Sequence, residues 1–299
     1  MRSATTATGP TPSLDGRTVI FLHIGKTGGT TLRKILHRNF RASEILLVRN
    51  PSRTPARLRR EETLDLFAAI PEADRARPRL IEGHTIFGLH RFVPRPSTYI
   101  TLLRDPVALA ASQYNWVRSD PTHWLHQQAR AMTIDEYADS GISLEIDNGQ
   151  TRAISGDTAT PYGACSRDTL ELAKRNIEEH FAVVGLIERF DESLLLLRRA
   201  FGWSKLHYVP ANFSLKRSGA VVSRRSLDRI AERNWLDIEL REFAVRRMER
   251  AMAEEPGFGS DLKRFRLSNT IYRRAWGDLT YTIPKRMVMR LSGAGRTGP

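Results

Sequence analysis

Short apolar runs alternate along the chain with segments in which apolar residues recur every three or four positions. The apolar runs predict strands, and the spacing of three or four predicts helices. Predicted strands lie at residues 18–24, 44–48, 79–82, 98–103, 182–186 and 207–209. Strands that alternate with helices predict an α/β fold of three layers, with a central, mostly parallel sheet flanked by helices.

Several predicted helices begin at recognisable signals. Asp105 followed by Pro106 predicts an N-cap and the first position of a helix. Thr133 and Glu136 have the spacing of a capping box. Further along, residues 227–252 predict one long helix with many charges.

Composition divides the chain into three parts. Residues 1–16 are rich in Thr, Pro, Gly and Ser and predict a flexible leader. Residues 17–256 predict the main domain. Residues 257–299 predict a basic C-terminal extension, with nine Lys and Arg against two Asp. This extension holds half of the net charge of +14, and such an excess favours anionic partners.

Two arrangements are possible for the basic extension, because its arginines alternate with apolar residues. It packs on the domain as a final helix, or it makes peripheral contact with an anionic membrane surface; packing is favoured. A nucleic-acid partner is not expected, since neither a basic stripe with aromatic platforms nor a known motif is present.

Cysteine usage and targeting signals predict the compartment. The single cysteine, Cys165, excludes a disulfide framework and a cysteine-based zinc cluster. The N-terminal residues show no apolar run or cleavage signature of a signal peptide. We therefore expect a reducing, cytoplasmic location, with the membrane contact of the extension as the one qualification.

Candidate chemistry begins at residues 18–36, TVIFLHIGKTGGTTLRKIL, where a predicted strand ends in glycines and a helix follows. A helix start presents backbone N–H groups and a partial positive charge, which suit an anion. Lys26 adds a full charge, and three threonines add hydroxyl donors. Anion binding is therefore favoured over a plain glycine turn.

The loop only partly matches a nucleotide-triphosphate loop. Residues 25–27 fit the end of G-x-x-x-x-G-K-[ST], whose first glycine would then stand at position 20. Position 20 is Ile, within the predicted strand, and Gly28 and Gly29 fall where the helix of such a loop already runs. An atypical P-loop kinase or NTPase is therefore kept only as the alternative.

Two motifs together resemble a known family. FLHIGKTGGTTL resembles the 5′-phosphosulfate loop of carbohydrate sulfotransferases, in the branch of the heparan sulfate 2-O-sulfotransferases. TYITLLRDP, residues 98–106, with Ser112 resembles the motif for the 3′-phosphate. Gly83-His84 resembles the segment that carries the catalytic base. The likeness covers roughly residues 17–252, and it departs from the family at Gly25, where Pro is usual.

The resemblance implies a sulfotransferase that uses 3′-phosphoadenosine-5′-phosphosulfate (PAPS) and needs no metal. The acceptor would be a hydroxyl, most simply on a carbohydrate or glycoconjugate. Lys26 would stabilise the phosphate oxygen that is left behind. The implied donor-binding residues are Gly25, Lys26, Thr27, Gly28, Gly29, Thr30 and Thr31 for the 5′ side, Arg104 and Ser112 for the 3′-phosphate, and Lys216 and Arg217 closing over the nucleotide.

His84 is the candidate general base among eight histidines. A neutral imidazole, with an ordinary pKa of about 6.5, accepts a proton at neutral pH. His23 alternates with Phe21 on one strand face, so it is expected to pack beside the loop. Gln150, Thr151 and Arg152 are expected to face the acceptor.

Overall fold

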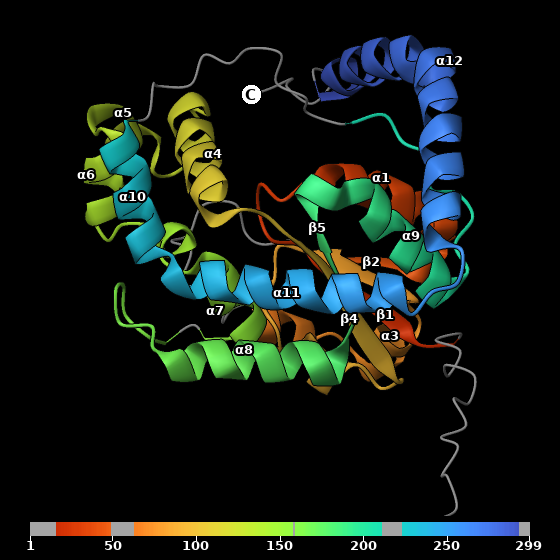
Figure 1. Ribbon diagram of the computed structural model, residues 1–299, viewed down its shortest axis with the longest axis horizontal. Helices are drawn as coiled ribbons and strands as arrows, with labels where there is room; N and C mark the ends of the chain where they lie inside the picture. Colours follow the sequence, from red (N-terminus) through yellow and green to blue (C-terminus); the bar gives the residue numbers. More distant parts are fainter. Residues whose placement is uncertain (1–15, 49–62, 158, 211–222, 293–299) are drawn as a thin grey trace, which may run out of the picture.

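The structure, a computed structural model, describes residues 16–48, 63–157, 159–210 and 223–292, with side chains as far as Trp276. Five strands form one sheet in the order β2-β3-β1-β4-β5, and every neighbouring pair is parallel (Figure 1). The strands are β1 (Thr18–Leu22), β2 (Ile45–Val48), β3 (Leu80–Gly83), β4 (Ser97–Leu103) and β5 (Phe181–Leu186). The predicted α/β fold with a parallel sheet is confirmed.

Helices cover both faces of the sheet. One face carries α1 and α9, and the other carries α8 with α7 (Figure 1). The helix α11 lies along α8 and β5, and α12 packs on α9. The helices are α1 (Gly29–Asn39), α3 (Glu72–Ala76), α4 (Pro106–Ser119), α5 (His126–Ala131), α6 (Ile134–Asp139), α7 (Gly149–Ser155), α8 (Arg167–His180), α9 (Phe190–Phe201), α10 (Arg224–Arg233), α11 (Trp235–Ala253) and α12 (Phe258–Ser292).

The order of the strands creates a place for a ligand. All five residues of β1 are buried, and β1 lies between β3 and β4 at the centre of the sheet. After β1 the chain continues through α1 to β2 on one side, whereas after β4 it continues to β5 on the other. The two connections diverge, so a crevice is expected outside the carboxyl ends of β1 and β4.

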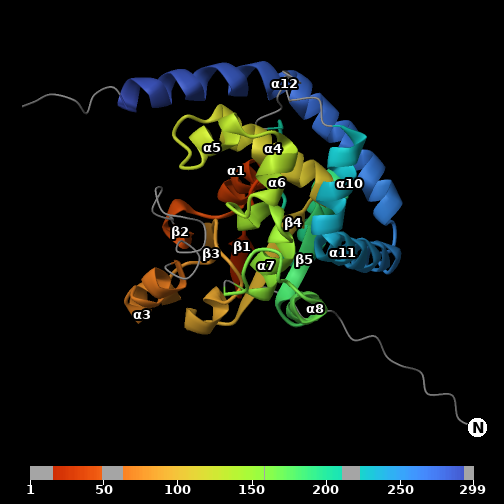
Figure 2. The ribbon, with the colours of Figure 1, turned by 90° about the vertical axis from the view of Figure 1, so that its left-hand side faces the viewer.

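A group of four helices, α4, α5, α6 and α10, lies together beside the sheet (Figures 1 and 2). It has its own apolar cluster, with Tyr114, Val117, Tyr137 and Ile230 among the buried members. The predicted signals are present at two of its helix starts: Asp105 accepts a hydrogen bond from the N–H of Ala108 at 2.8 Å, and the capping box of α6 is formed.

The prediction of a single helix at residues 227–252 is wrong, because the helix is interrupted at Asn234. Asn234 has a non-helical backbone, with φ −107° and ψ 31°, and separates α10 from α11. Its side chain donates to the carbonyl of Ile146 at 3.0 Å and accepts from the N–H of Asn148 at 3.0 Å. The strand expected at residues 207–209 is also absent, and those residues form an irregular segment.

The start of the expected C-terminal extension is part of the main domain. Phe258 and Phe265 of α12 are buried in the principal core, and Asn269 accepts a hydrogen bond from the N–H of Tyr208 at 2.8 Å. Arg273 lies over the ring of Tyr208, 4.4 Å from its centroid. Packing therefore continues well past residue 256. Of the helices in the described residues, none is long and apolar enough to cross a membrane.

Candidate active site

The carboxyl ends of three strands bring the predicted phosphate residues together. The loop at residues 25–28 follows β1, Arg104 follows β4, and His84 follows β3. Since β1 pairs with both β3 and β4, all three positions lie at one edge of the sheet. The phosphate loop, the arginine and the histidine are thus brought to the same edge by the fold.

Two positions of the loop favour glycine, Gly29 because of close packing and Gly28 because of its backbone conformation. A Cβ atom on Gly29 would lie 2.1 Å from ring atoms of His23, and one on Gly28 would lie 3.0 Å from Ile187. Gly28 also has φ +85° and begins α1 without a side-chain cap. Gly25 is different, because its nearest neighbour, Gln113, is 3.9 Å from the Cβ position. Steric crowding therefore does not require a glycine at position 25.

Lys26 occupies an unusual backbone conformation at the centre of this loop. Its φ is +62°, in the left-handed region that costs a non-glycine residue about 1–2 kcal/mol. Its ammonium lies over the exposed ring of Trp116, 5.5 Å from the ring centroid. Burial, and then the nearby Arg104, lower the pKa of Lys26. A bound anion would relieve this disfavoured positive charge.

Arg104 joins the two predicted phosphate sites. Its guanidinium donates a hydrogen bond of 2.9 Å to the carbonyl of Lys26, and so holds the left-handed residue from the neighbouring strand end. Burial lowers the pKa of Arg104, although Glu188 and Asp105 act in the opposite direction. A partly desolvated guanidinium at this edge is suited to an anion with paired oxygens, such as a phosphate.

His84 is exposed and is held by His23. Its Nδ1 donates to the carbonyl of His23 at 3.1 Å, and the two rings stack with centroids 4.1 Å apart. Because the carbonyl can only accept, Nδ1 carries the proton of the neutral ring and Nε2 is its basic nitrogen. This is the tautomer that a general base at Nε2 needs.

His23 has the supporting place that strand alternation predicted. It is buried, stacks on Phe21 with centroids 5.1 Å apart, and fills the space beside Gly29. Burial, His84 and Arg33 lower the pKa of His23 to about 3. At neutral pH its ring is therefore uncharged and a far weaker base than an ordinary imidazole, which leaves His84 as the better candidate.

The placement of Gln150, Thr151 and Arg152 does not fit the expectation that they face an acceptor. All three are fully buried at the start of α7. Thr151 donates its hydroxyl to Asp237 at 2.7 Å, and Arg152 forms a buried ion pair with Asp147. Their side chains are used inside the domain, because they join α7 to α11 and to residues 160–161.

Gln150 has a positioning role that its sequence context did not predict. Its side-chain amide accepts from the N–H of Arg104 at 2.9 Å and donates to the carbonyl of the same residue at 3.0 Å. The backbone N–H of Gln150 in turn donates to Asp237 at 3.1 Å. A sequence signal existed in the Asn148-x-Gln150-Thr151-Arg152 segment, but its partner Asp237 is 87 residues away.

The remaining residues that were predicted to bind PAPS differ in their exposure to solvent. Thr27 is fully buried and donates its hydroxyl to the carbonyl of Ile24 at 2.9 Å, so it stabilises the turn. Thr30 is exposed and Thr31 is buried in the first turn of α1. Ser112 is half-buried on α4, about two turns from its start. Lys216 and Arg217 lie outside the described residues.

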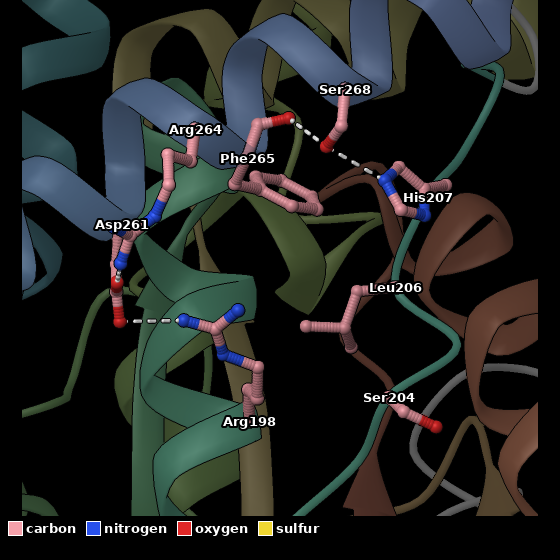
Figure 3. Close-up of a pocket in the computed structure, with 8 residues that line it drawn as sticks. All are labelled: Arg198, Ser204, Leu206, His207, Asp261, Arg264, Phe265 and Ser268. Carbon is pink, nitrogen blue, oxygen red and sulfur yellow. Dashed lines mark hydrogen bonds and ion pairs between the residues drawn. The ribbon is translucent and has the colours of Figure 1, made fainter.

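A pocket lies away from this edge. It has a volume of about 280 Å³ and is formed by α9, α12 and the segment after α9 (Figure 3). Asp261 pairs there with Arg198 and Arg264, and His207 shares a hydrogen bond of 2.8 Å with Ser268. It adjoins the C-terminal end of α1, since His207 accepts from Arg38, whereas the phosphate loop is at the other end.

Comparison with known proteins shows that the sequence is similar to carbohydrate sulfotransferases. Galactose-3-O-sulfotransferase 3 of Homo sapiens is 31% identical over 200 residues, which cover 62% of this chain and 45% of that protein. Uronyl 2-sulfotransferase of Mus musculus is 28% identical over 196 residues, covering 60% and 47%. Heparan-sulfate 6-O-sulfotransferase 1 of Homo sapiens is 28% identical over 269 residues, covering 76% and 64%. The chain thus spans about half to two thirds of these relatives.

The expected cytoplasmic location is wrong for such a protein. The carbohydrate sulfotransferases that the chain resembles are enzymes of the Golgi lumen. A single cysteine predicted a reducing compartment through a general correlation between cysteine usage and redox environment. That correlation does not report where a particular glycan-modifying family works.

The family itself is identified by a match over most of the chain. The sequence profile of the galactose-3-O-sulfotransferase family matches residues 2–261. This span contains β1 with its glycine loop, β3 with His84, and β4 with Arg104. The chain therefore belongs to the galactose-3-O-sulfotransferase family.

Proposed function

We propose that this protein transfers a sulfuryl group from PAPS to a hydroxyl of a carbohydrate or glycoconjugate. The observation that carries the proposal is the hydrogen bond from Arg104 to the carbonyl of Lys26. It joins the end of β4 to the loop after β1, so one edge of the sheet offers cations for two separate phosphate groups. A donor with a 5′-phosphosulfate and a 3′-phosphate needs such a pair of sites.

The residues present fit this donor. The start of α1 has no side-chain cap and follows Gly28 with its positive φ, and such a helix start suits the 5′-phosphosulfate. Arg104, with Ser112 two turns along α4, suits the 3′-phosphate. When bound, PAPS supplies an activated sulfuryl group on a phosphate oxygen. Any contact from Lys216 and Arg217 belongs to the proposal alone, since both lie outside the described residues.

His84 prepares the acceptor in this proposal. Its Nε2 takes the proton of the acceptor hydroxyl as the oxygen bonds to sulfur, and the hydrogen bond from Nδ1 to His23 fixes the ring. The imidazolium that forms is still bonded to a carbonyl through Nδ1, which stabilises the new charge. The acceptor oxygen gains the bond to sulfur as the bond from sulfur to the donor phosphate breaks.

Lys26 stabilises the phosphate oxygen that is left behind. Negative charge develops on that oxygen during transfer, and a cation placed beforehand in a partly buried site interacts strongly with it. The left-handed backbone of Lys26, held by Arg104, fixes where the side chain begins. Positioning and charge stabilisation by the residues of the chain are thus the main contributions to catalysis.

Transfer of labelled sulfate from PAPS to a panel of glycans tests this function. Calorimetric titration with adenosine 3′,5′-bisphosphate should show binding that Arg104→Ala weakens, while ADP and ATP bind more weakly to the wild type. Nucleotide-dependent phosphate release without any sulfate transfer would instead support the alternative, an atypical P-loop kinase or NTPase. Absence of binding to the bisphosphate would refute the proposed donor.

A further inference from the structure

An exposed indole lies beside the reactive lysine. Trp116 is on α4, one turn after Ser112, so both residues lie on the same side of that helix. The ammonium of Lys26 is 5.5 Å from the centroid of the Trp116 ring, and 37% of Trp116 is exposed. A large aromatic surface is thus open to solvent next to the group that we assign to the departing phosphate oxygen.

The core does not account for this indole. Trp116 belongs to neither of the two apolar clusters formed by the described residues. Aromatic side chains commonly line ligand sites, and this one lies next to a residue of the candidate site. The cation over one part of the ring is worth only about 0.5–1 kcal/mol at an exposed position. Holding Lys26 is therefore a limited role for so large a side chain.

Neighbouring groups fix the orientation of the ring. His123 approaches it edge to face, with centroids 4.8 Å apart, and Trp124 stacks on His123 at 6.0 Å. The turn that carries His123 is closed by two backbone hydrogen bonds of 3.0 Å, from Asp120 to the carbonyl of Trp116 and from His123 to that of Asp120. The aromatic surface is thus preorganised, which reduces the entropy lost when a ligand packs on it.

We propose that Trp116 is a stacking platform for a sugar ring of the acceptor. A hexopyranose has a face of C–H groups that carry partial positive charge, and such a face packs on the negative face of an indole. A ring placed there has its hydroxyl groups close to Lys26 and therefore to the transferred group. This inference rests on the proposed function and adds a role for Trp116: it orients the acceptor by packing on an accessible apolar face of one sugar ring.

The test compares two tryptophans with matched surroundings. Trp235 is 38% exposed and lies under a cation, with Arg167 5.2 Å from its ring centroid, but it is at the start of α11 and outside the site. The variants Trp116→Ala, Trp116→Phe and Trp235→Ala are each assayed for sulfate transfer to lactose, dermatan and N-sulfated heparosan. Saccharide binding to the protein with adenosine 3′,5′-bisphosphate is measured in parallel.

Trp116→Ala should raise the KM for the saccharide that is sulfated by about tenfold, the loss of roughly one aromatic stacking contact. Its Kd for adenosine 3′,5′-bisphosphate should stay within about twofold of the wild-type value. Trp116→Phe should recover most of the affinity, and Trp235→Ala should keep it. An unchanged KM in Trp116→Ala, a fall in kcat alone, or a wild type that binds none of the three saccharides would overturn the platform. Failure of the wild type to bind the bisphosphate would instead refute the donor assignment.

Discussion

The loop after β1 and the start of α7 contain the two non-glycine residues with left-handed backbones among the described residues, Lys26 at φ 62° and Asn148 at φ 52°. Each is held by a partner distant in sequence. Arg104 bonds to the carbonyl of Lys26, whereas Asn234 accepts from the N–H of Asn148. The same left-handed backbone conformation thus has two different roles. At Lys26 it presents a half-buried cation, and at Asn148 it is part of a buried polar junction.

Lys26→Ala should have the largest effect, and it should be on turnover rather than on stability. Loss of one preorganised group that stabilises developing charge lowers kcat by about 10²–10³-fold. The melting temperature should stay near the wild-type value, because the half-buried side chain lies outside both apolar clusters of the described residues. Sulfate transfer and thermal unfolding measure the two quantities. Turnover above a tenth of the wild-type value would remove Lys26 from the mechanism.

Arg152→Ala should show the opposite behaviour, with a large effect on stability. It leaves Asp147 buried without its ion pair, and such a change costs about 3–5 kcal/mol of unfolding free energy. Urea unfolding of the full chain measures it. Arg167→Ala is the matched control, because its ion pair with Glu239 is exposed to solvent and contributes little to stability. Equal losses in the two variants would contradict the buried junction.

Gln150→Ala should show that the start of α7 affects nucleotide binding through Arg104. Two hydrogen bonds of about 1 kcal/mol each hold the backbone of Arg104, so their loss should weaken binding of adenosine 3′,5′-bisphosphate by about tenfold. Asn176→Ala removes a comparable buried amide that bonds to the carbonyl of Ile154, and it should lower stability while leaving the affinity intact. If both variants bind alike in calorimetry, Gln150 is only a structural residue.

The smallest effect expected is a displacement of the pH profile. Lys26 must be protonated to act, and burial and Arg104 lower its pKa. The alkaline limb of kcat/KM for PAPS should therefore fall below the ordinary lysine value of about 10.4. In Lys26→Arg the limb should move to higher pH, since guanidinium stays charged. An alkaline limb at the same pH in both proteins would assign it to another group.

The sequence predicted the sheet well, for a physical reason. Buried parallel strands are continuous apolar runs, so β1, β3, β4 and β5 begin and end within one or two residues of their predicted bounds. The glycine loop after β1 and the place of Arg104 at the end of β4 followed from the two motifs and the strands before them, whereas the hydrogen bond from Arg104 to Lys26 did not. The place of His23 beside the loop also followed, because strand alternation decides it.

What could not be predicted depends on partners far along the chain. The helix is interrupted at Asn234 because its side chain forms hydrogen bonds with the backbone of Ile146 and Asn148, and no Gly or Pro nearby indicates an interruption in the sequence. The burial of Gln150 and Thr151 depends on Asp237 in the same way. Polar residues give the same sequence pattern whether they face solvent or a buried carboxylate, so the sequence did not show that residues 150–152 are buried.

The bond between Arg104 and Lys26 also has a consequence for nucleotide discrimination. Under the proposed function, one guanidinium serves the 3′-phosphate and steadies the loop for the 5′ group, so the two sites are energetically coupled. A nucleotide without a 3′-phosphate leaves a partly desolvated cation without its anion and gives up that coupling. Under the same proposal, ATP would bind weakly because it lacks a 3′-phosphate, and the length of its phosphate chain would matter less.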